Sequence, residues 1–548
     1  MKKALIFPLT LIVIFISIAL IFKWQSLDIF SRKLFSSDKF GFPDAMQTQI
    51  VELKNGSYYD LTATIVKKMI GGSEVKMLAY NGMIPGPTIK VQKGAEITLN
   101  FTNNTDVDAT IHSHGVRLEN KFDGVPDVTQ EAIKPGQSFI YKIKFPDEGV
   151  YWYHPHIRED YAQELGLYGN FLVLPNKKDY WAEVDREEIL FIDDILMENG
   201  QIAPFSKSTV DHTLMGRFGN IMLVNGSDNY KLSVKQGERI RFYITNSAST
   251  RVFNVSIPNT RMKLVGADNG KYEREEWIDS VILGPSERVI VEIWFDESGD
   301  YKITHKTPEK TYSIGTIAVQ KNPVTTSYFL IPRINQDFID SISSLRPLFV
   351  RPPDKRLRIT INMGGQMQNM MQNQNTSTFG GEHGSHMMPN GQMMSNNSML
   401  ARQSLGDGGM GTSSGQPIEW EDTGGTMNIM ADTSMLRWIM LDEDTQKANA
   451  GIDDWKFRVG DKVKISIFND PNSMHPMQHP IHFHGQRFLV LSRDDIPNNN
   501  LVWKDTVLVK NGERVDILLD VTNPGNWVAH CHIPEHMEAG MMFQYKVI

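Results

Sequence analysis

The carboxyl-terminal run His-Cys-His-Ile-Pro-Glu-His, residues 530–536, contains the only cysteine of the 548-residue chain. In a β-strand, residues i and i+2 share a face and residue i+1 points to the other side. His530 and His532 would therefore face one site while Cys531 faces a second. This run predicts two neighbouring sites that are joined by adjacent residues.

The cysteine has the companions that a blue-copper centre requires. One thiolate, imidazoles and a distant thioether form such a centre, and Cys531, His536 and Met541 supply three of its four ligands. A buried free cysteine is the structural alternative, since unpaired cysteines are common in cores. The rest of the chain decides between the two.

Ten of the fifteen histidines fall into four tight groups. A single H-x-H pair is often only a solvent-facing or core pair, but four groups are hard to explain structurally. Sorting by strand face leaves His479 to join Cys531, His536 and Met541. The other eight imidazoles, enough for three copper ions between the first and third domains, are His112, His114, His154, His156, His482, His484, His530 and His532.

Short strands of alternating polarity, separated by turn residues, begin near Gln49 and predict β-sandwiches. A repeated pattern at 81–94, 224–237 and 455–460 leads each time into such a strand, which indicates repeated domains. We expect linkers at 24–44 and 323–354. The expected domains are 45–178, 179–322 and 355–548.

Composition excludes one class of partner and one kind of cross-link. The net charge of −8 and the pI near 6.0 argue against a nucleic-acid-binding protein, which would normally have a basic face. One cysteine cannot form an internal disulfide, so each domain depends on its core.

Residues 1–23 predict a signal-anchor or a signal peptide. Two lysines precede an apolar run, residues 4–22, that matches the ~20 residues of a membrane-crossing helix. A cleaved signal usually has a shorter core of ~7–15 residues. We favour an uncleaved anchor, with a removed signal as the alternative. In either case the lysines favour a body outside the cytoplasm, anchored to the membrane, secreted or periplasmic.

Residues from 363 to about 415 interrupt the β pattern with methionine, glutamine, asparagine, glycine and serine. Such a segment cannot bury enough apolar surface to pack as a core unit, so we expect a mobile insertion. Thioethers prefer Cu(I), which favours a copper-handling loop that uses Met387, Met388, His383 and His386. The alternative is a polar linker in which methionine happens to be frequent.

The four histidine groups resemble those of the three-domain multicopper oxidases, the laccase and cuprous-oxidase family, over about residues 45–548. The H-x-H, H-P-x-H-x-H and H-C-H-x3-H-x4-M motifs carry this resemblance and are highly specific. It implies an all-β fold of three cupredoxin-like Greek-key β-sandwich domains. It also implies four copper ions that couple one-electron oxidation of a substrate to the reduction of dioxygen to water.

The resemblance assigns the ligands residue by residue. His112 and His482 match those of the type 2 copper. His114, His154, His156, His484, His530 and His532 match those of the type 3 pair. His479, Cys531 and His536 match those of the type 1 copper, with Met541 as its weak axial ligand. The second domain, which has only His212 and His305, should be free of copper.

The same resemblance predicts the path of electrons. They should enter through the solvent-facing edge of His479 and pass from Cys531 through His530 and His532. Protons are needed as well, and Asp123 matches the family's acid near the type 2 copper. A turn residue before a glycine is the alternative for Asp123.

Two positions depart from the family pattern. Ser113 stands where the family usually has an aromatic residue, and Met537 stands where several relatives carry an acid. Glu535 and Glu538 are the candidates to replace that acid.

The reducing substrate is the least determined feature. The insertion, together with Met474 and Met477, favours Cu(I). The alternative is a laccase-like oxidase of small phenols and aromatic amines, in which these two methionines are loop packing. A third hypothesis is an extracytoplasmic copper-binding protein without turnover. The sequence leaves the oligomeric state open.

Overall fold

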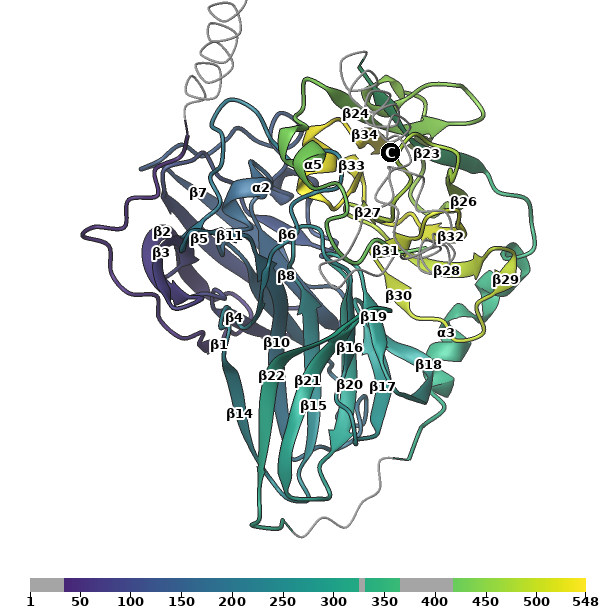
Figure 1. Cartoon of the computed structure of the whole chain (residues 1–548). Coiled ribbons are helices and arrows are strands. Elements are labelled where there is room, and N and C mark those ends of the chain that lie inside the picture. The colour runs from purple at the N-terminus through teal and green to yellow at the C-terminus, as the bar shows by residue number, and fades with distance from the viewer. Residues whose placement is uncertain (1–33, 325–330, 365–416) are drawn as a thin grey trace, which may run out of the picture.

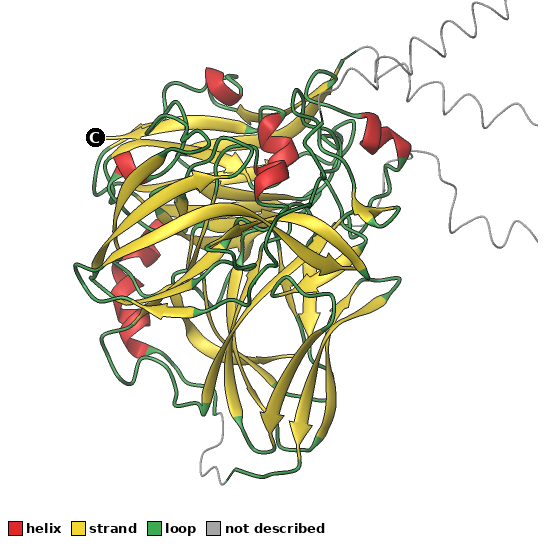
Figure 2. Ribbon diagram, turned by 90° about the vertical axis from the view of Figure 1, so that its left-hand side faces the viewer, coloured by secondary structure: helices red, strands yellow, loops and turns green. Residues whose placement is uncertain are grey.

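β-Strands are by far the commonest regular structure of the described residues, which confirms the all-β prediction. The structure is a computed structural model that describes residues 34–324, 331–364 and 417–548. Figure 2 shows long strands through most of the molecule, and the helices of the described residues are all short. The large sheets pair into three sandwiches. The first and third lie side by side, and the second lies below them in Figure 1.

The first sandwich encloses the core that contains Leu61, Ile97 and Phe171. One sheet has the order β3 (Ser73–Tyr80), β2 (Tyr58–Ile70), β5 (Glu96–Asn104) and β7 (Ser138–Lys144). The other has the order β1 (Ile50–Glu52), β4 (Thr88–Gln92), β9 (Gly169–Leu174), β8 (Gly149–His154) and β6 (His112–His114). Two short helices flank it, η1 (Asn120–Phe122) and α2 (Glu159–Ala162).

The second sandwich has its own core around Phe242, Val291 and Ile317. One sheet has the order β13 (Ile221–Val224), β10 (Arg186–Ile195), β15 (Arg239–Asn246), β20 (Arg288–Trp294), β17 (Met262–Ala267) and β18 (Gly270–Ile278). The other has the order β14 (Tyr230–Lys235), β22 (Thr311–Gln320), β21 (Gly299–Lys306), β16 (Phe253–Ser256) and β19 (Val281–Leu283). A separate ribbon pairs β11 (Met197–Glu198) with β12 (Gln201–Ile202).

The third sandwich follows α3 (Gln336–Ile342) and η2 (Ser343–Leu348). One sheet has the order β24 (Leu436–Asp442), β23 (Lys355–Met363), β26 (Lys462–Asn469), β32 (Arg514–Asp520), β28 (Arg487–Arg493) and β29 (Ile496–Pro497), with β30 (Trp503–Lys504) also on β28. The other has the order β25 (Lys456–Phe457), β34 (Met542–Val547), β33 (Gly525–Cys531), β27 (His479–Phe483) and β31 (Thr506–Val509). Its helices are α5 (Thr426–Met430), η4 (Asn449–Gly451) and α6 (Pro534–Glu538).

The sequence repeat occupies the same place in each sandwich. Strands β4, β14 and β25 are each followed by a turn with a glycine at positive φ, at Gly94, Gly237 and Gly460. The next strand, β5, β15 or β26, then pairs in parallel with the first strand of its own sheet, β2, β10 or β23. The exact domain boundaries stay a prediction.

Strand register brings the histidine groups together in pairs. On the first sandwich, β6 and β8 place His112 opposite His154. On the third, β27 and β33 place His482 opposite His530. Two local pairings therefore present their histidines from two different sandwiches.

Several predicted features fall outside the described residues. They include the segment 1–23 and the candidates Met387, Met388, His383 and His386. Among the residues that are described, no helix is long and apolar enough to cross a membrane. Met363 was expected to open the insertion, but this was wrong: it ends β23 and is 2% exposed, because the strand alternation continues through it.

Candidate metal centre

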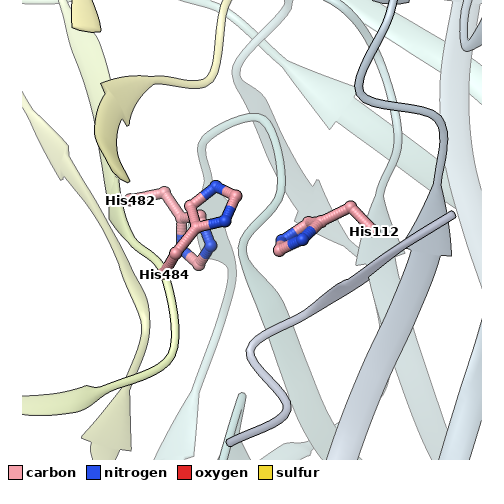
Figure 3. Close-up of side chains that lie close together, drawn as sticks. All are labelled: His112, His482 and His484. Atoms are coloured by element: carbon pink, nitrogen blue, oxygen red, sulfur yellow. The ribbon is translucent and has the colours of Figure 1, made fainter. Parts of the chain in front are cut away.

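Eight histidines from two sandwiches converge between β6, β8, β27 and β33. The rings of His112 and His484 lie 4.0 Å apart, and those of His114 and His482 lie 3.8 Å apart. Figure 3 shows His482 and His484 facing His112 across the gap between the sandwiches. All eight side chains are buried, with at most 6% exposed, so the cluster excludes bulk water.

Most of these rings are held by Nδ1 and leave Nε2 for the centre. The Nδ1 atoms of His112, His154, His482 and His530 donate to the carbonyl oxygens of Asp123, Pro155, Asp505 and Cys531 at 2.8–2.9 Å. His484 Nδ1 donates to Asp123 Oδ2 at 2.8 Å. Each of these Nε2 atoms is therefore unprotonated and presents a lone pair inward.

The inward lone pairs have no protein donor. The Nε2 atoms of His112, His154 and His482 have no hydrogen-bond partner among the described residues. His484 Nε2 and His530 Nε2 lie 2.9 Å apart, so their lone pairs would repel unless a proton or a metal ion lies between them. Buried unpaired polar atoms cost about 1–3 kcal/mol each. A cation bound between these lone pairs would remove that cost.

His114 is turned the other way. Its Nε2 lies 3.0 Å from Asp505 Oδ1 and 2.9 Å from Thr506 Oγ1. Its Nδ1 is the atom without a partner in the described chain. His156 Nδ1 lies 3.5 Å from Glu159 Oε1, and its Nε2 likewise has no partner there.

In several groups of the cluster the ligand atoms lie within 4.8 Å of one another. Among them are His112 with His482 and His484, His112 with His114 and His154, His156 with His484 and His530, and His114 with His482 and Asp505. Metal ligation requires neutral imidazole. Burial is the main cause that lowers the pKa of His114, His154, His156 and His482 well below the ordinary value. Neutral imidazole nitrogens of this cluster can therefore bind soft or borderline cations.

A second site lies in the core of the third sandwich. Cys531 Sγ is 3.6 Å from His479 Nδ1 and 3.9 Å from His536 Nδ1, and these two nitrogens are 3.3 Å apart. The backbone N–H of Cys531 donates to the carbonyl of Met541, which places the buried Met541 beside the site. Burial raises the pKa of the Cys531 thiol, so metal binding must release its proton.

The two sites share one short piece of chain. Cys531 belongs to the second site, while His530 and His532 belong to the cluster, with ring centroids 5.3 Å apart. His532 follows the end of β33, yet it lies 4.9 Å from the ring of His154. Cys531 is therefore bonded through the backbone to one cluster histidine on each side, His530 and His532.

Asp123 lies between ligands from both sandwiches. Its carboxylate accepts from His484, and its backbone carbonyl accepts from His112. Gly124, at φ +80°, has no room for a side chain, since a Cβ would lie 2.1 Å from the carbonyl oxygen of Ile111. The glycine therefore lets this turn approach the backbone of Ile111 and His112 closely, and Asp123 contacts two histidines of the cluster from that turn.

The remaining candidate acids lie where α2 contacts α6. Glu535 is 1% exposed, and its two carboxylate oxygens have no hydrogen-bond partner among the described residues. Burial, followed by nearby Asp160, raises the pKa of Glu535 to about 8. Glu538 is exposed at the end of α6. Between this helix and the cluster lies the buried Glu159, whose pKa burial raises well above its usual value.

Two expectations near Cys531 are corrected. His479 was expected to have a solvent-facing edge, but it is 0% exposed, and its ring lies 4.7 Å from that of Trp438. Met477 was a candidate to meet substrate, but it is 0% exposed and packs in the core of the third sandwich. The first expectation came from the family resemblance and the second from the position of Met477 just before His479. Neither shows which segments cover these side chains in the fold. Met474 is 47% exposed.

Sequence reasoning missed several residues of the site. His475 lies close to His479 and His536, and its Nε2 is buried without a partner in the described chain. Burial lowers the pKa of His475 to about 4. The sequence could have indicated His475 as a candidate, because it lies only four residues before His479. Trp152, stacked on His154 at 4.1 Å, stands two residues before that histidine. Ser113 was not missed, since the sequence singled it out as a departure from the family pattern; it is buried, and its Oγ has no partner among the described residues.

Three β-sandwiches, a histidine cluster between the first and the third, and a Cys-His-His site one residue away together define a copper-dependent oxidoreductase. Family models described as multicopper oxidase match residues 62–178, 178–330 and 423–548. The chain belongs to the multicopper oxidase family. It is an oxidoreductase that contains copper, and its three domains have the cupredoxin-like fold that the resemblance implied.

Individual relatives agree over nearly the whole chain. It is 24% identical to multicopper oxidase mco of Staphylococcus aureus, covering 87% of this chain and 85% of that protein. It is 24% identical to copper resistance protein A of Escherichia coli, covering 93% and 95%. The solved multicopper oxidase of Campylobacter jejuni, described as a metallo-oxidase, has a TM-score of 0.63 at 24% identity, covering 94% and 98%. This last likeness shows the fold.

Proposed function

We propose that this oxidase converts Cu(I) to Cu(II) outside the cytoplasm while reducing dioxygen to water. The balanced reaction consumes four Cu(I), four protons and one dioxygen, and it yields four Cu(II) and two waters. The names of two relatives, copper resistance protein A and a metallo-oxidase, support a metal substrate. The exported location rests on the predicted segment 1–23.

The ligand sets that we propose are those implied by the resemblance. His112 and His482 would hold a type 2 copper. A type 3 pair would be held by His114, His154, His156, His484, His530 and His532. His479, Cys531, His536 and Met541 would hold a type 1 copper. When bound, these ions supply stepwise electron transfer to dioxygen. The unpaired inward nitrogens support these assignments.

The burial of His479 is the observation that carries the choice of substrate. A phenol or an aromatic amine would have to contact the edge of this ring, and that edge is covered. A single ion needs only a few donor atoms at the surface. Met474, 47% exposed, and His475, neutral near pH 7 because of burial, offer a thioether and an imidazole next to His479. Both are ligands that suit Cu(I).

Protons would come from this chain's acids. Asp123 contacts His484 in the cluster and would pass protons on that side. Glu535 holds its proton near neutral pH because burial raises its pKa to about 8. Glu538, exposed on the same helix, would take protons from solvent and return them to Glu535.

Steady-state kinetics on Cu(I) and on a phenol test the substrate. We expect Met474→Leu and His475→Gln each to raise KM for Cu(I) about tenfold, the equivalent of ~1.4 kcal/mol, with phenol kinetics unchanged. Met69→Leu, at an exposed methionine of the first sandwich, is the matched control. Deletion of residues 365–416 should also slow Cu(I) oxidation. If all these variants oxidise Cu(I) like the parent while the parent prefers the phenol, the proposal is wrong and the laccase-like alternative holds.

A further inference from the structure

The second sandwich reaches the histidine cluster through one arginine. Arg288, the first residue of β20, is 0% exposed. Its Nε donates to the carbonyl of Val150 on β8 at 2.9 Å. Its Nη1 and Nη2 donate to the two carboxylate oxygens of Asp505 at 2.6 and 2.5 Å. Since Asp505 belongs to the third sandwich, a single guanidinium joins all three.

Asp505 in turn contacts two histidines of the cluster. Its Oδ1 lies 3.0 Å from His114 Nε2, and its backbone carbonyl accepts from His482 Nδ1 at 2.8 Å. The hydroxyl of Thr506 donates to the same Oδ1 at 3.0 Å and lies 2.9 Å from His114 Nε2. All of these side chains are buried.

This geometry determines where His114 carries its proton. A carboxylate held by both nitrogens of a guanidinium is ionised and only accepts hydrogen bonds. His114 Nε2 must therefore be the protonated nitrogen that donates to Asp505. The lone pair is left on Nδ1, which is buried and has no partner among the described residues. His114 is also one of the three residues whose ligand atoms form the group with His112 and His154.

Gly115 shows that the Arg288–Asp505 ion pair packs directly against the end of strand β6, which carries His114. Gly115 follows His114 at φ +80°. A Cβ at this position would lie 2.1 Å from Asp505 Oδ2 and 3.0 Å from Arg288 Nη2. The glycine of the His-Ser-His-Gly motif is thus required by the Arg288–Asp505 pair and not only by a turn.

We propose that Arg288 and Asp505 are positioning residues that fix His114 in the tautomer with Nδ1 free for metal. The second sandwich, although we expect it to hold no copper, would then control copper binding at the cluster. This inference rests on the proposed ligand role of His114. It does not depend on which substrate is oxidised.

The test measures copper affinity separately at the two sites. Asp505→Asn replaces one of the two acceptor oxygens with a donor, so one of Arg288 and His114 loses its acceptor. Arg288→Lys keeps the charge but cannot bind both oxygens. Metal content is followed by chelator competition on the intact protein, and the blue absorption of the Cys531 site serves as an internal reference. We expect cluster affinity to fall about 10–100-fold, the usual effect of removing a partner of a ligand, with the blue absorption retained.

Two further variants make the result specific. Arg241→Lys changes a buried arginine of the same sheet that pairs with Glu292 and contacts none of the described histidines, and it should leave both sites unchanged. Thr506→Val removes the hydroxyl beside His114 Nε2 and its hydrogen bond to Asp505 but keeps the Arg288–Asp505 pair, so it should weaken the cluster less than Asp505→Asn does. Parental cluster affinity in both Asp505→Asn and Arg288→Lys would overturn the proposal. So would equal losses at both sites, or an equal loss in Arg241→Lys.

The outcome is distinguishable from failure of the proposed function. If the parent protein binds copper at the cluster but does not oxidise Cu(I), the substrate proposal fails while these affinity differences can still be measured. If Cu(I) is oxidised and the affinities do not change, only the positioning role fails.

Discussion

Glu535 makes the stability of the copper-free protein depend on pH. The native pKa of about 8 lies above the ordinary value of 4.5. The native state therefore binds a proton that the unfolded state has lost between these two values. Stability consequently falls as pH rises through this window. At 1.36 kcal/mol per pH unit, the full window corresponds to about 5 kcal/mol, an upper limit because partial hydration would reduce it.

The assay compares Glu535→Gln with the parent by urea unfolding of the copper-free protein at pH 5 and at pH 8. Taking the difference between the two proteins cancels every other titrating group that they share. Near pH 5 the parent carries a neutral acid and the variant a neutral amide, so their stabilities should be similar. At pH 8 the variant should be more stable by several kcal/mol, up to about 5.

Glu198→Gln is the control for this assay, because Glu198 is exposed and its carboxylate is solvated at both pH values. A difference between Glu535→Gln and the parent that is the same at pH 5 and pH 8 would refute the assignment of Glu535 as a buried neutral acid. It would also remove the support for its role as a proton donor.

Two further predictions concern the metal sites. Asp123→Asn should weaken copper binding at the cluster about 10–100-fold, because His484 Nδ1 loses its charged acceptor while His112 keeps a backbone carbonyl; chelator competition measures this. Asp147→Asn, which breaks ion pairs with Arg117 and Arg487 but contacts no histidine in the described chain, should leave that affinity unchanged, and an equal loss there would contradict the reasoning. Cys531→Ser should abolish the blue absorption and oxygen uptake while cluster copper is retained, as measured by metal analysis; loss of all copper would show that the two sites do not form independently.

Sequence patterns predicted the histidine cluster because strand alternation is a local rule. His112 and His114, or His530 and Cys531, are sorted by neighbouring positions alone, and the structure places the histidines in one cluster and the sulfur in the other site. The repeated glycine turns were equally local, and they predicted three copies of one unit.

Long-range contacts could not be predicted in this way. Asp505 lies 391 positions from His114, and no spacing rule joins them. The burial of His479 and Met477 depends on which segments cross the third sandwich. Side chains that the sequence predicts to be exposed on a loop can therefore be buried in the fold. Met363 shows the opposite error, since its composition matched the insertion while its alternation matched β23.

The central claim is that ten imidazoles, one thiolate and one thioether bind copper in two adjoining sites. Metal analysis of the purified protein after copper loading and dialysis, read together with its blue absorption, tests this most directly. We predict four copper ions per chain, one of which is lost together with the blue colour in Cys531→Ser. A loaded protein that holds a single copper ion, or one whose copper content is unchanged by replacing His112, His154 and His484, would contradict the account.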